Sequence, residues 1–244
     1  KLSVAVVGAR NCTPYGRDMA RMFSYRLAAA GVFVISGMAL GIDGWGHQGA
    51  LEAGGETYAV LGSGVMRCYP SCHQNLYESI VRHGGVISEF PVYARAKPVF
   101  FPMRNRIISG LSDGILVVEA REKSGSLITA DAALEQGKDV FVIPGRIGDE
   151  LSVGCNRLIR MGAVPVLTPD DILDYYGVKT SDGSRNVNET EQKILAFLGG
   201  KTMHMDEISA GLSLPMTQLL KCMIVLQKKG YVIEVGRNFF MKKI

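Results

Sequence analysis

The sequence lacks any uninterrupted apolar run close to the about 20 residues that a membrane-spanning helix needs. It begins directly with strand-like residues, 1–7, and has no small-residue cleavage site of the kind that ends a signal peptide. We therefore expect a cytoplasmic protein with no membrane partner. Its 244 residues, 47% hydrophobic and 20% charged, suffice to bury the core of one large domain and a small second one.

Cysteine and histidine are scarce, which argues against two kinds of site. The five cysteines are an odd and scattered set, so we expect a reducing compartment and no disulfide framework. The cluster Cys68-x-x-x-Cys72-His73 offers three metal ligands on one short stretch and no distant partner pair. The four histidines show no spacing of the H-E-x-x-H type. The sequence thus predicts no metal and no cofactor.

Residues 1–177, the larger part of the chain, carry no net charge. The net charge of the whole chain is +4, yet residues 1–177 hold 17 basic and 17 acidic side chains, so the excess belongs to residues 178–244. If the larger part binds a polyanion, it must do so with a local patch of cations and not with a general field.

Short runs rich in β-branched residues alternate with segments whose apolar residues recur every three or four positions. This alternation predicts an α/β fold for residues 1–177, a Rossmann-like parallel sheet with helices on both faces. The nearly continuous hydrophobic strands fit a sheet that is buried on both sides. The predicted strands are 4–7, 32–35, 58–61, 85–87, 115–118, 140–143 and 164–167, and the predicted helices are 16–30, 43–53, 127–136 and 151–161.

Residues 178–188 are polar and aperiodic, and they predict a linker. Residues 189–244 then have the pattern of a small C-terminal winged-helix domain, with helices at 189–198, 205–211 and 214–229 and a hairpin at 231–242. The third helix carries no arginine where a major-groove reader would place one. Its lysines can contact a DNA backbone, but a solvated face or a protein-contact module explains them equally well.

Ligands of open parallel α/β sheets bind beyond the carboxyl ends of the strands. Five predicted strand ends here combine glycine or serine with a cation or a helix start. The candidate binding residues at these ends are Gly8, Arg10, Ser36, Gly37, Gly41, Gly62, Gly64, Arg67, Arg104, Asn105, Arg106, Lys123, Ser124, Gly125 and Ser126.

Helix starts add to the anion-binding character of these ends. Thr13 is a good N-cap and Pro14 a good first helical residue, so free N–H groups are expected near Arg10. Ser126 is the predicted N-cap of the helix 127–136. Five such ends in a row favour a long ligand with several phosphates. The alternative stays open, because glycine-rich strand ends are also what tight βα turns require.

Familiar nucleotide and catalytic motifs are absent. Arg10 stands where the dinucleotide fingerprint needs its second glycine, and no Walker motif occurs. Ser124-Gly125-Ser126 lacks the G-x-S-x-G pattern of a hydrolase elbow. Asp43 and Glu119 lie at strand ends, either as an acid–base pair or, as we favour, as buried partners of arginines or as helix caps.

An ordered set of motifs gives a specific resemblance over about residues 3–176. The motifs are Gly8-x-Arg10, Ser36-Gly37-x-Ala39-x-Gly41-Ile42-Asp43, Gly62-x-Gly64 with Tyr69-Pro70, Phe101-Pro102-x-Arg104-Asn105-Arg106, Lys123-Ser124-Gly125-Ser126 and Pro144-Gly145. They closely resemble the DNA-processing protein A family, also called DprA or Smf.

The resemblance implies an extended Rossmann fold and a non-enzymatic protein that binds single-stranded DNA without sequence preference. It also implies a homodimer formed through this domain, and a role in protecting incoming DNA and loading the RecA recombinase during natural transformation. Arg10 and Lys123 match positions of the family's DNA pocket, whereas Glu56 is acidic where members often carry a basic residue. Many members have a small helical domain before the Rossmann part, so we expect this sequence to be a piece of a longer protein.

Two rival interpretations remain. One is a nucleotide-processing phosphoribohydrolase, whose P-G-G-x-G-T loop lies about where residues 124–129 lie, although the double glycine is missing here. The other is a DNA-binding regulator that acts through the winged helix alone. Binding assays with nucleoside monophosphates and with single-stranded oligonucleotides separate the three.

Overall fold

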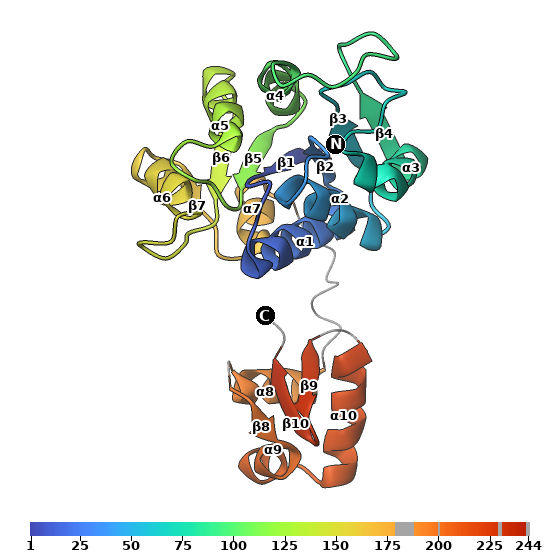
Figure 1. Cartoon of the computed structure of the whole chain (residues 1–244). Coiled ribbons are helices and arrows are strands. Elements are labelled where there is room, and N and C mark those ends of the chain that lie inside the picture. The colour runs from blue at the N-terminus through green and yellow to red at the C-terminus, as the bar shows by residue number, and fades with distance from the viewer. Residues whose placement is uncertain (179–187, 200, 229–230, 243–244) are drawn as a thin grey trace. The chain divides into compact units, whose positions relative to one another are not determined.

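The computed structural model describes residues 1–178, 188–199, 201–228 and 231–242, which belong to two units, Lys1–Lys179 and Thr180–Ile244 (Figure 1). The predicted linker at 178–188 falls mostly on residues 179–187, which lie outside the described residues. Its two ends belong to the units themselves. Val178 packs against the core of the first unit, and Asn188 caps the first helix of the second.

The first unit is built on a seven-stranded sheet, in which every described neighbour is parallel. The strands are β1 (Ser3–Val7), β2 (Phe33–Ser36), β3 (Thr57–Val60), β4 (Gly84–Ile87), β5 (Gly114–Val117), β6 (Asp139–Val142) and β7 (Val164–Pro165). Their order is β4-β3-β2-β1-β5-β6-β7, so the direction of winding reverses between β1 and β5. The predicted Rossmann-like parallel sheet is confirmed, and the ligand crevice of such a sheet lies at this reversal.

Helices cover both faces of the sheet (Figure 1). They are α1 (Pro14–Ala29), α2 (Ile42–Glu52), α3 (Gln74–His83), α4 (Phe100–Gly110), α5 (Gly125–Glu135), α6 (Val153–Arg160) and α7 (Pro169–Tyr175), with a short 3-10 turn at Ser71–His73. Alternate residues of a strand face opposite sides. Accordingly Val4 and Val6 of β1 join the core under α1, α2 and α7, whereas Ala5 and Val7 join the core under α4, α5 and α6.

Helices α3, α4 and α7 were not predicted, and the reason is clearest for α4. Its buried residues are Arg104, Asn105, Ile108 and Ser109, so three of the four are polar and the apolar period is hidden. Helix α3 buries only Ile80. The sequence therefore assigned no helix to residues 101–106, although they belong to α4.

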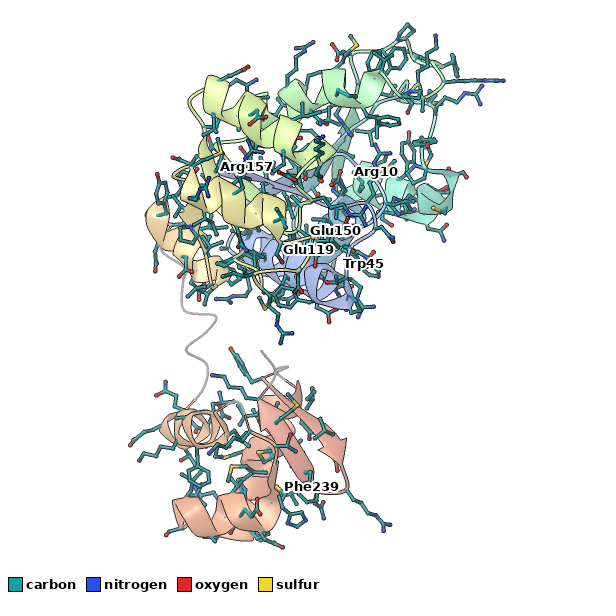
Figure 2. The ribbon with its side chains drawn as sticks, turned by 60° about the vertical axis from the view of Figure 1, so that its left-hand side comes forward. Arg10, Trp45, Glu119, Glu150, Arg157 and Phe239 are labelled. Carbon is teal, nitrogen blue, oxygen red and sulfur yellow. The ribbon has the colours of Figure 1, made fainter. Side chains whose placement is uncertain are left out.

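The second unit contains α8 (Glu189–Leu198), β8 (Met203–His204), α9 (Met205–Leu212), α10 (Met216–Lys228), β9 (Val232–Gly236) and β10 (Phe239–Lys242), with an antiparallel sheet of order β8-β10-β9. Phe239 packs against His204 across this sheet, with ring centroids 4.9 Å apart (Figure 2). The three helices and the hairpin lie where the sequence placed them, and the winged-helix assignment stays a prediction. No single helix among the described residues is long and apolar enough to cross a membrane, although 205–212 and 216–227, bent by 115°, pass that test as a pair.

Helices α1 and α2 cross very closely because glycines form the contact. A Cβ atom placed on Gly49 would lie 2.2 Å from the carbonyl oxygen of Arg21, and one on Gly46 would lie 3.3 Å from the hydroxyl oxygen of Ser24. Only glycine fits at such an approach of two backbones. The crossing brings the starts of both helices to the carboxyl edge of the sheet.

We predict that Gly49→Ala lowers the free energy of unfolding by about 1–3 kcal/mol, because the added methyl group overpacks this crossing. Gly110→Ala is the matched control, since the atoms nearest to its Cβ would lie 3.8 Å and 4.0 Å away. Thermal unfolding should show a lower Tm for the first variant only. Equal melting temperatures would contradict this account of the crossing.

Candidate functional site

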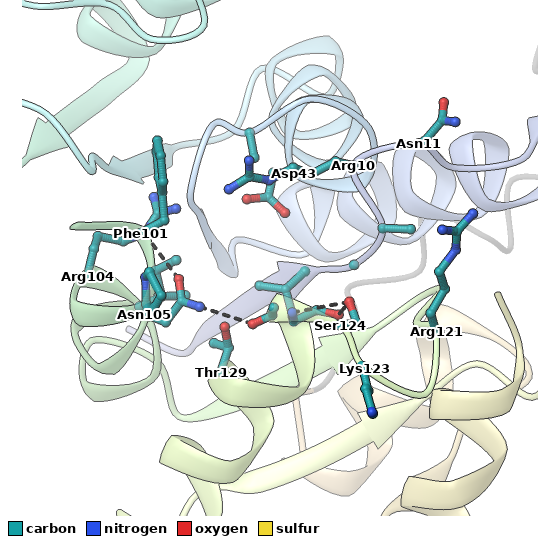
Figure 3. Close-up of a pocket in the computed structure, with 18 of the residues that line it drawn as sticks. Arg10, Asn11, Asp43, Phe101, Arg104, Asn105, Arg121, Lys123, Ser124 and Thr129 are labelled. Carbon is teal, nitrogen blue, oxygen red and sulfur yellow. Dashed lines mark hydrogen bonds between the residues drawn. The ribbon is translucent and has the colours of Figure 1, made fainter. Parts of the chain in front are cut away.

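An open cavity of about 550 Å³ lies at the carboxyl edge of the sheet, where the winding reverses (Figure 3). The β1–α1 loop, the β5–α5 loop and α4 supply most of its wall. Eight of the predicted site residues line it: Gly8, Arg10, Arg104, Asn105, Lys123, Ser124, Gly125 and Ser126. Seven others lie outside it: Ser36, Gly37, Gly41, Gly62, Gly64, Arg67 and Arg106.

Arg10 is exposed in the β1–α1 loop and is free to bind an anion. Among the described residues it forms no hydrogen bond and no ion pair, and its guanidinium carbon lies 4.8 Å from the centroid of the Phe101 ring. A guanidinium stacked on a ring keeps its N–H groups available at the edge. Arg10 can therefore donate two hydrogen bonds to one phosphate.

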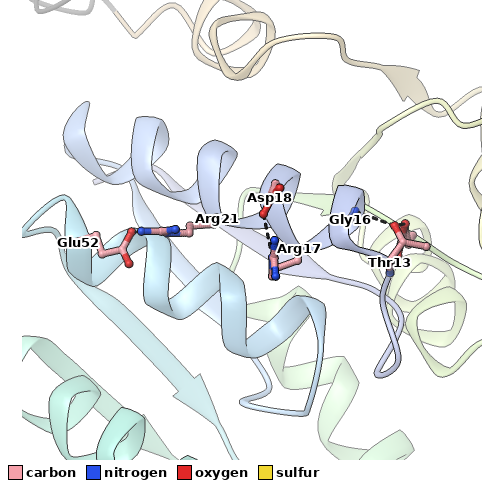
Figure 4. A network of polar contacts seen from close by, with 7 residues as sticks. Thr13, Gly16, Arg17, Asp18, Arg21 and Glu52 are labelled. Atoms are coloured by element: carbon pink, nitrogen blue, oxygen red, sulfur yellow. Dashed lines mark hydrogen bonds and ion pairs between the residues drawn. The ribbon is translucent and has the colours of Figure 1, made fainter. Parts of the chain in front are cut away.

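Glu119 holds the loop that carries Arg10. The backbone N–H of Thr13 donates to the Glu119 carboxylate at 2.9 Å, the Thr13 hydroxyl donates to the same group, and the N–H of Ala9 donates to the Glu119 carbonyl at 2.8 Å. The Thr13 hydroxyl also accepts from the N–H of Gly16, which confirms Thr13 as the N-cap (Figure 4). The N–H groups of Thr13 and Gly16 are therefore not free, because Glu119 and the Thr13 hydroxyl accept them.

Arg104 is a buried structural arginine. Its side chain is 3% exposed, and one guanidinium nitrogen donates to the carbonyl of Gly37 at 2.8 Å and to that of Val60. Burial lowers the pKa of Arg104 to about 10, and nearby Asp43 opposes that shift. Arg104 thus ties the ends of β2 and β3 together beneath the cavity.

Asp43 is buried beside this arginine. Its carboxylate accepts the N–H of Gly37 at 3.1 Å, and burial raises its pKa although Arg104 and Arg10 favour the charged form. Together with the contacts of Glu119, this favours the interpretation of both carboxylates as structural partners over that of an acid–base pair.

Asn105 and Arg106 follow Arg104 on α4 and take different directions from it. The Asn105 amide donates to the carbonyl of Gly125 at 3.1 Å and so joins α4 to the start of α5. Residues that are two positions apart on a helix point in directions about 200° apart, so Arg106 points to the side of α4 opposite Arg104. Arg106 accordingly lies outside the cavity and pairs with Glu89.

The β5–α5 loop supplies the second free cation. Lys123 is exposed and forms no ion pair among the described residues, whereas neighbouring Arg121 pairs with Glu150 at 3.3 Å. The helix begins at Gly125, because the Ser124 side chain accepts the N–H of Ser126. The predicted N-cap at Ser126 is therefore wrong by two residues. A Cβ atom on Gly125 would meet nothing within 4 Å, so this helix start is open to a ligand.

The remaining glycine-rich ends are tight turns. A Cβ atom on Gly41, whose φ is +76°, would lie 2.2 Å from the carbonyl oxygen of Ala9, and one on Gly64 would lie 2.1 Å from that of Pro91. A Cβ atom on Gly37 would lie 2.5 Å from the Arg104 guanidinium, and one on Gly62 would lie 2.7 Å from the Phe101 ring. Ser36 is buried and donates to the carbonyl of Val6 at 2.6 Å, and Arg67 is exposed away from the cavity. After β2 and β3, the structure therefore favours the alternative that the glycines are required by tight turns and not by a ligand.

Two aromatic residues of the cavity wall were not among the predicted site residues. The rings of Tyr69 and Phe101 lie 5.5 Å apart, and both residues line the cavity beside Arg10. Aromatic faces next to cations are typical of single-strand binding surfaces, because every nucleobase can stack on them. The sequence did indicate them, because each is an aromatic residue in a strand-end segment that also contains arginine: Tyr69 in residues 62–70 and Phe101 in residues 101–106.

The fold and this site define a Rossmann-like protein whose crevice presents free cations and aromatic faces. The family model described as "DNA recombination-mediator protein A" matches residues 1–177, and the chain belongs to this family. Protein Smf of Escherichia coli is 38% identical over 97% of this chain, and DNA processing protein DprA of Streptococcus pneumoniae is 44% identical over 70% of it. The chain spans 67% and 60% of the length of these two relatives.

Solved structures agree with this assignment. The crystal structure of DprA from Streptococcus pneumoniae has a TM-score of 0.67 at 41% identity and covers 71% of this chain and 61% of its own. DprA from Helicobacter pylori, described for its single-stranded DNA binding mode, has the same TM-score at 29% identity and covers 72% and 80%. A molybdenum cofactor binding protein from Rippkaea orientalis, at 19% identity and a TM-score of 0.53, shares the fold alone.

We predict that Arg104→Ala lowers the free energy of unfolding by at least about 2 kcal/mol, because a buried group that loses its hydrogen-bond partner costs about 1–3 kcal/mol. Arg10→Ala should change it by less than about 0.5 kcal/mol, as surface substitutions usually do. Urea unfolding of both variants checks this. A destabilised Arg10→Ala protein beside a stable Arg104→Ala protein would reverse the two roles.

Proposed function

We propose that this protein binds single-stranded DNA in the cavity at the β1–β5 reversal, without modifying it. The observation that carries the proposal is that Arg10 and Lys123 have no anionic partner within the described residues, although carboxylates lie close by and are engaged elsewhere. Membership of the family and the DNA-binding relative from Helicobacter pylori support it.

The strand is held mainly through its phosphates. Arg10 supplies a bidentate guanidinium, Lys123 a point charge and the open start of α5 backbone N–H groups. The faces of Tyr69 and Phe101 accept bases without reading their edges. Binding should therefore depend strongly on salt and little on sequence. Residues 1–177 are neutral overall, so the attraction comes from this local patch.

The biological role proposed here rests on the relatives. We infer that the protein shields incoming single-stranded DNA and loads the RecA recombinase on it during natural transformation, as a homodimer formed through the first unit. The second unit adds weaker contacts to DNA or to a protein partner. A RecA strand-exchange assay on DNA precoated with single-strand binding protein tests the loading step, since loading should shorten the lag.

We predict that Arg10→Ala and Lys123→Ala each weaken oligothymidylate binding by about 10-fold or more, because a charge-assisted hydrogen bond contributes about 1.5–3 kcal/mol. Each loss of a phosphate contact should reduce the salt slope by about 0.7 from a starting value near −3. Arg106→Ala is the control, because it removes the same charge from a side chain that is paired with Glu89 outside the cavity. Fluorescence anisotropy at several salt concentrations measures all four proteins. Equal affinities of Arg10→Ala and Arg106→Ala would refute the placement of the site.

We further predict that a fragment ending after Val178 keeps most of the affinity for single-stranded DNA. All cavity residues lie before this point, and Val178 must be retained because it packs against the core. A gel-shift comparison of the fragment, residues 188–244 and the full chain measures the division. Binding by residues 188–244 alone, with none by the fragment, would move the site to the second unit.

A further inference from the structure

Trp45, the chain's single tryptophan, lies exposed at the start of α2, which contacts the loop that carries Arg10. It follows Gly41 by one turn at the start of α2, and its residue is 37% exposed. Gly41 touches the Arg10 segment directly, since a Cβ atom there would lie 2.5 Å from the Arg10 carbonyl oxygen, and the N–H of Ile42 donates to the Ala9 carbonyl at 3.2 Å. The first turn of α2 and the loop of Arg10 are therefore one rigid piece.

The direction of helical side chains places the indole toward the cavity edge. A Cα–Cβ bond in a helix is tilted toward the N-terminus, so a side chain covers the turn before its own Cα. The turn before Trp45 is the one in contact with the Arg10 loop. Figure 2 shows Trp45 and Arg10 on neighbouring elements. Leu40, 46% exposed, lies between them in sequence and extends the apolar surface.

Packing does not account for this tryptophan. The contact between α1 and α2 is made by small residues, with Gly46 and Gly49 at its closest points. Arg21, in the middle of α1, pairs at 2.5 Å with Glu52 at the end of α2 (Figure 4). Trp45 belongs neither to the buried core under these helices nor to the partly buried residues packed against it.

Arg17 supports the ring from α1. Its guanidinium carbon lies 5.7 Å from the centroid of the Trp45 ring, and its Nε pairs with exposed Asp18 at 2.8 Å (Figure 4). A large aromatic face with an adjoining cation is the combination that single-strand binding proteins use to stack a base and attract its phosphate. Tyr15, 53% exposed in the first turn of α1, lies at the same edge of the sheet.

We propose that Trp45, supported by Arg17, is a stacking platform for a nucleobase of the strand bound at Arg10, so that the DNA leaves the cavity across the start of α2. This rests on the proposed function and adds a base contact outside the residues that line the cavity. Because stacking uses the face of the base, the platform raises affinity without giving sequence preference.

Intrinsic fluorescence reports on this site without a label, because no other tryptophan is present. Titration of the full chain with oligothymidylate should quench the emission of Trp45 in parallel with the binding measured by anisotropy. An abasic strand of the same length, which has phosphates and sugars but no bases, should bind more weakly and quench much less.

Two variants and one matched control separate stacking from folding. Trp45→Ala should weaken oligothymidylate binding about 5-fold or more, the range for loss of one aromatic–base contact, and leave the affinity for the abasic strand unchanged. Trp45→Phe should restore much of the difference between the two strands. Tyr25→Ala is the control, since Tyr25 is a 44% exposed aromatic residue on α1, about 15 Å along the helix from Tyr15.

The outcomes distinguish this proposal from the proposed function. If oligothymidylate binds and Arg10→Ala weakens binding about 10-fold or more, but the emission of Trp45 does not change on binding to the unaltered protein, the platform is overturned and the cavity site stands. An equal loss of affinity for both strands in Trp45→Ala also overturns it, because the residue then acts through the backbone. If Arg10→Ala binds both strands normally, the cavity site itself is wrong.

Discussion

The contact between the Glu119 carboxylate and the start of α1 determines what the crevice can bind. Glu119 follows β5, Thr13 precedes α1, and the reversal of winding makes their strands neighbours. A buried carboxylate without other partners would ordinarily pair with a nearby cation and cancel its charge. Here the backbone N–H and hydroxyl of Thr13 satisfy the carboxylate, so the loop is rigid and Arg10 keeps its full charge for a ligand.

The same division holds for the other charged groups around the cavity. Arg104 and Asp43 are buried and join the ends of β2 and β3, and Arg106 is paired with Glu89. Arg10 and Lys123 remain, on two loops at opposite sides of the reversal. Two free cations and two aromatic faces fit an extended, flexible polyanion better than a compact nucleotide, because no closed phosphate loop surrounds them.

The sequence predicted the sheet well because its strands are nearly continuous hydrophobic runs, whose signal depends only on local residues. It failed at α4, whose inner face carries Arg104 and Asn105. Buried polar residues remove the apolar periodicity by which a helix is recognised in sequence. Only the tertiary structure shows that their polar groups have hydrogen-bond partners. Among the predicted site residues, Arg10 and Lys123 lie in the cavity, whereas the glycines after β2 and β3 serve close backbone approaches. A glycine required by a ligand and one required by a turn look alike in sequence, because the distinction depends on what lies opposite the missing Cβ.

A crystal structure of the full chain with a short oligothymidylate tests the central claim most directly. The account predicts a phosphate within hydrogen-bond distance of the Arg10 guanidinium, a base against the ring of Phe101 or Tyr69, and an unchanged contact between Glu119 and Thr13. A strand bound to the second unit with the cavity empty, or an Arg10 side chain turned away to pair with Glu119, would contradict it.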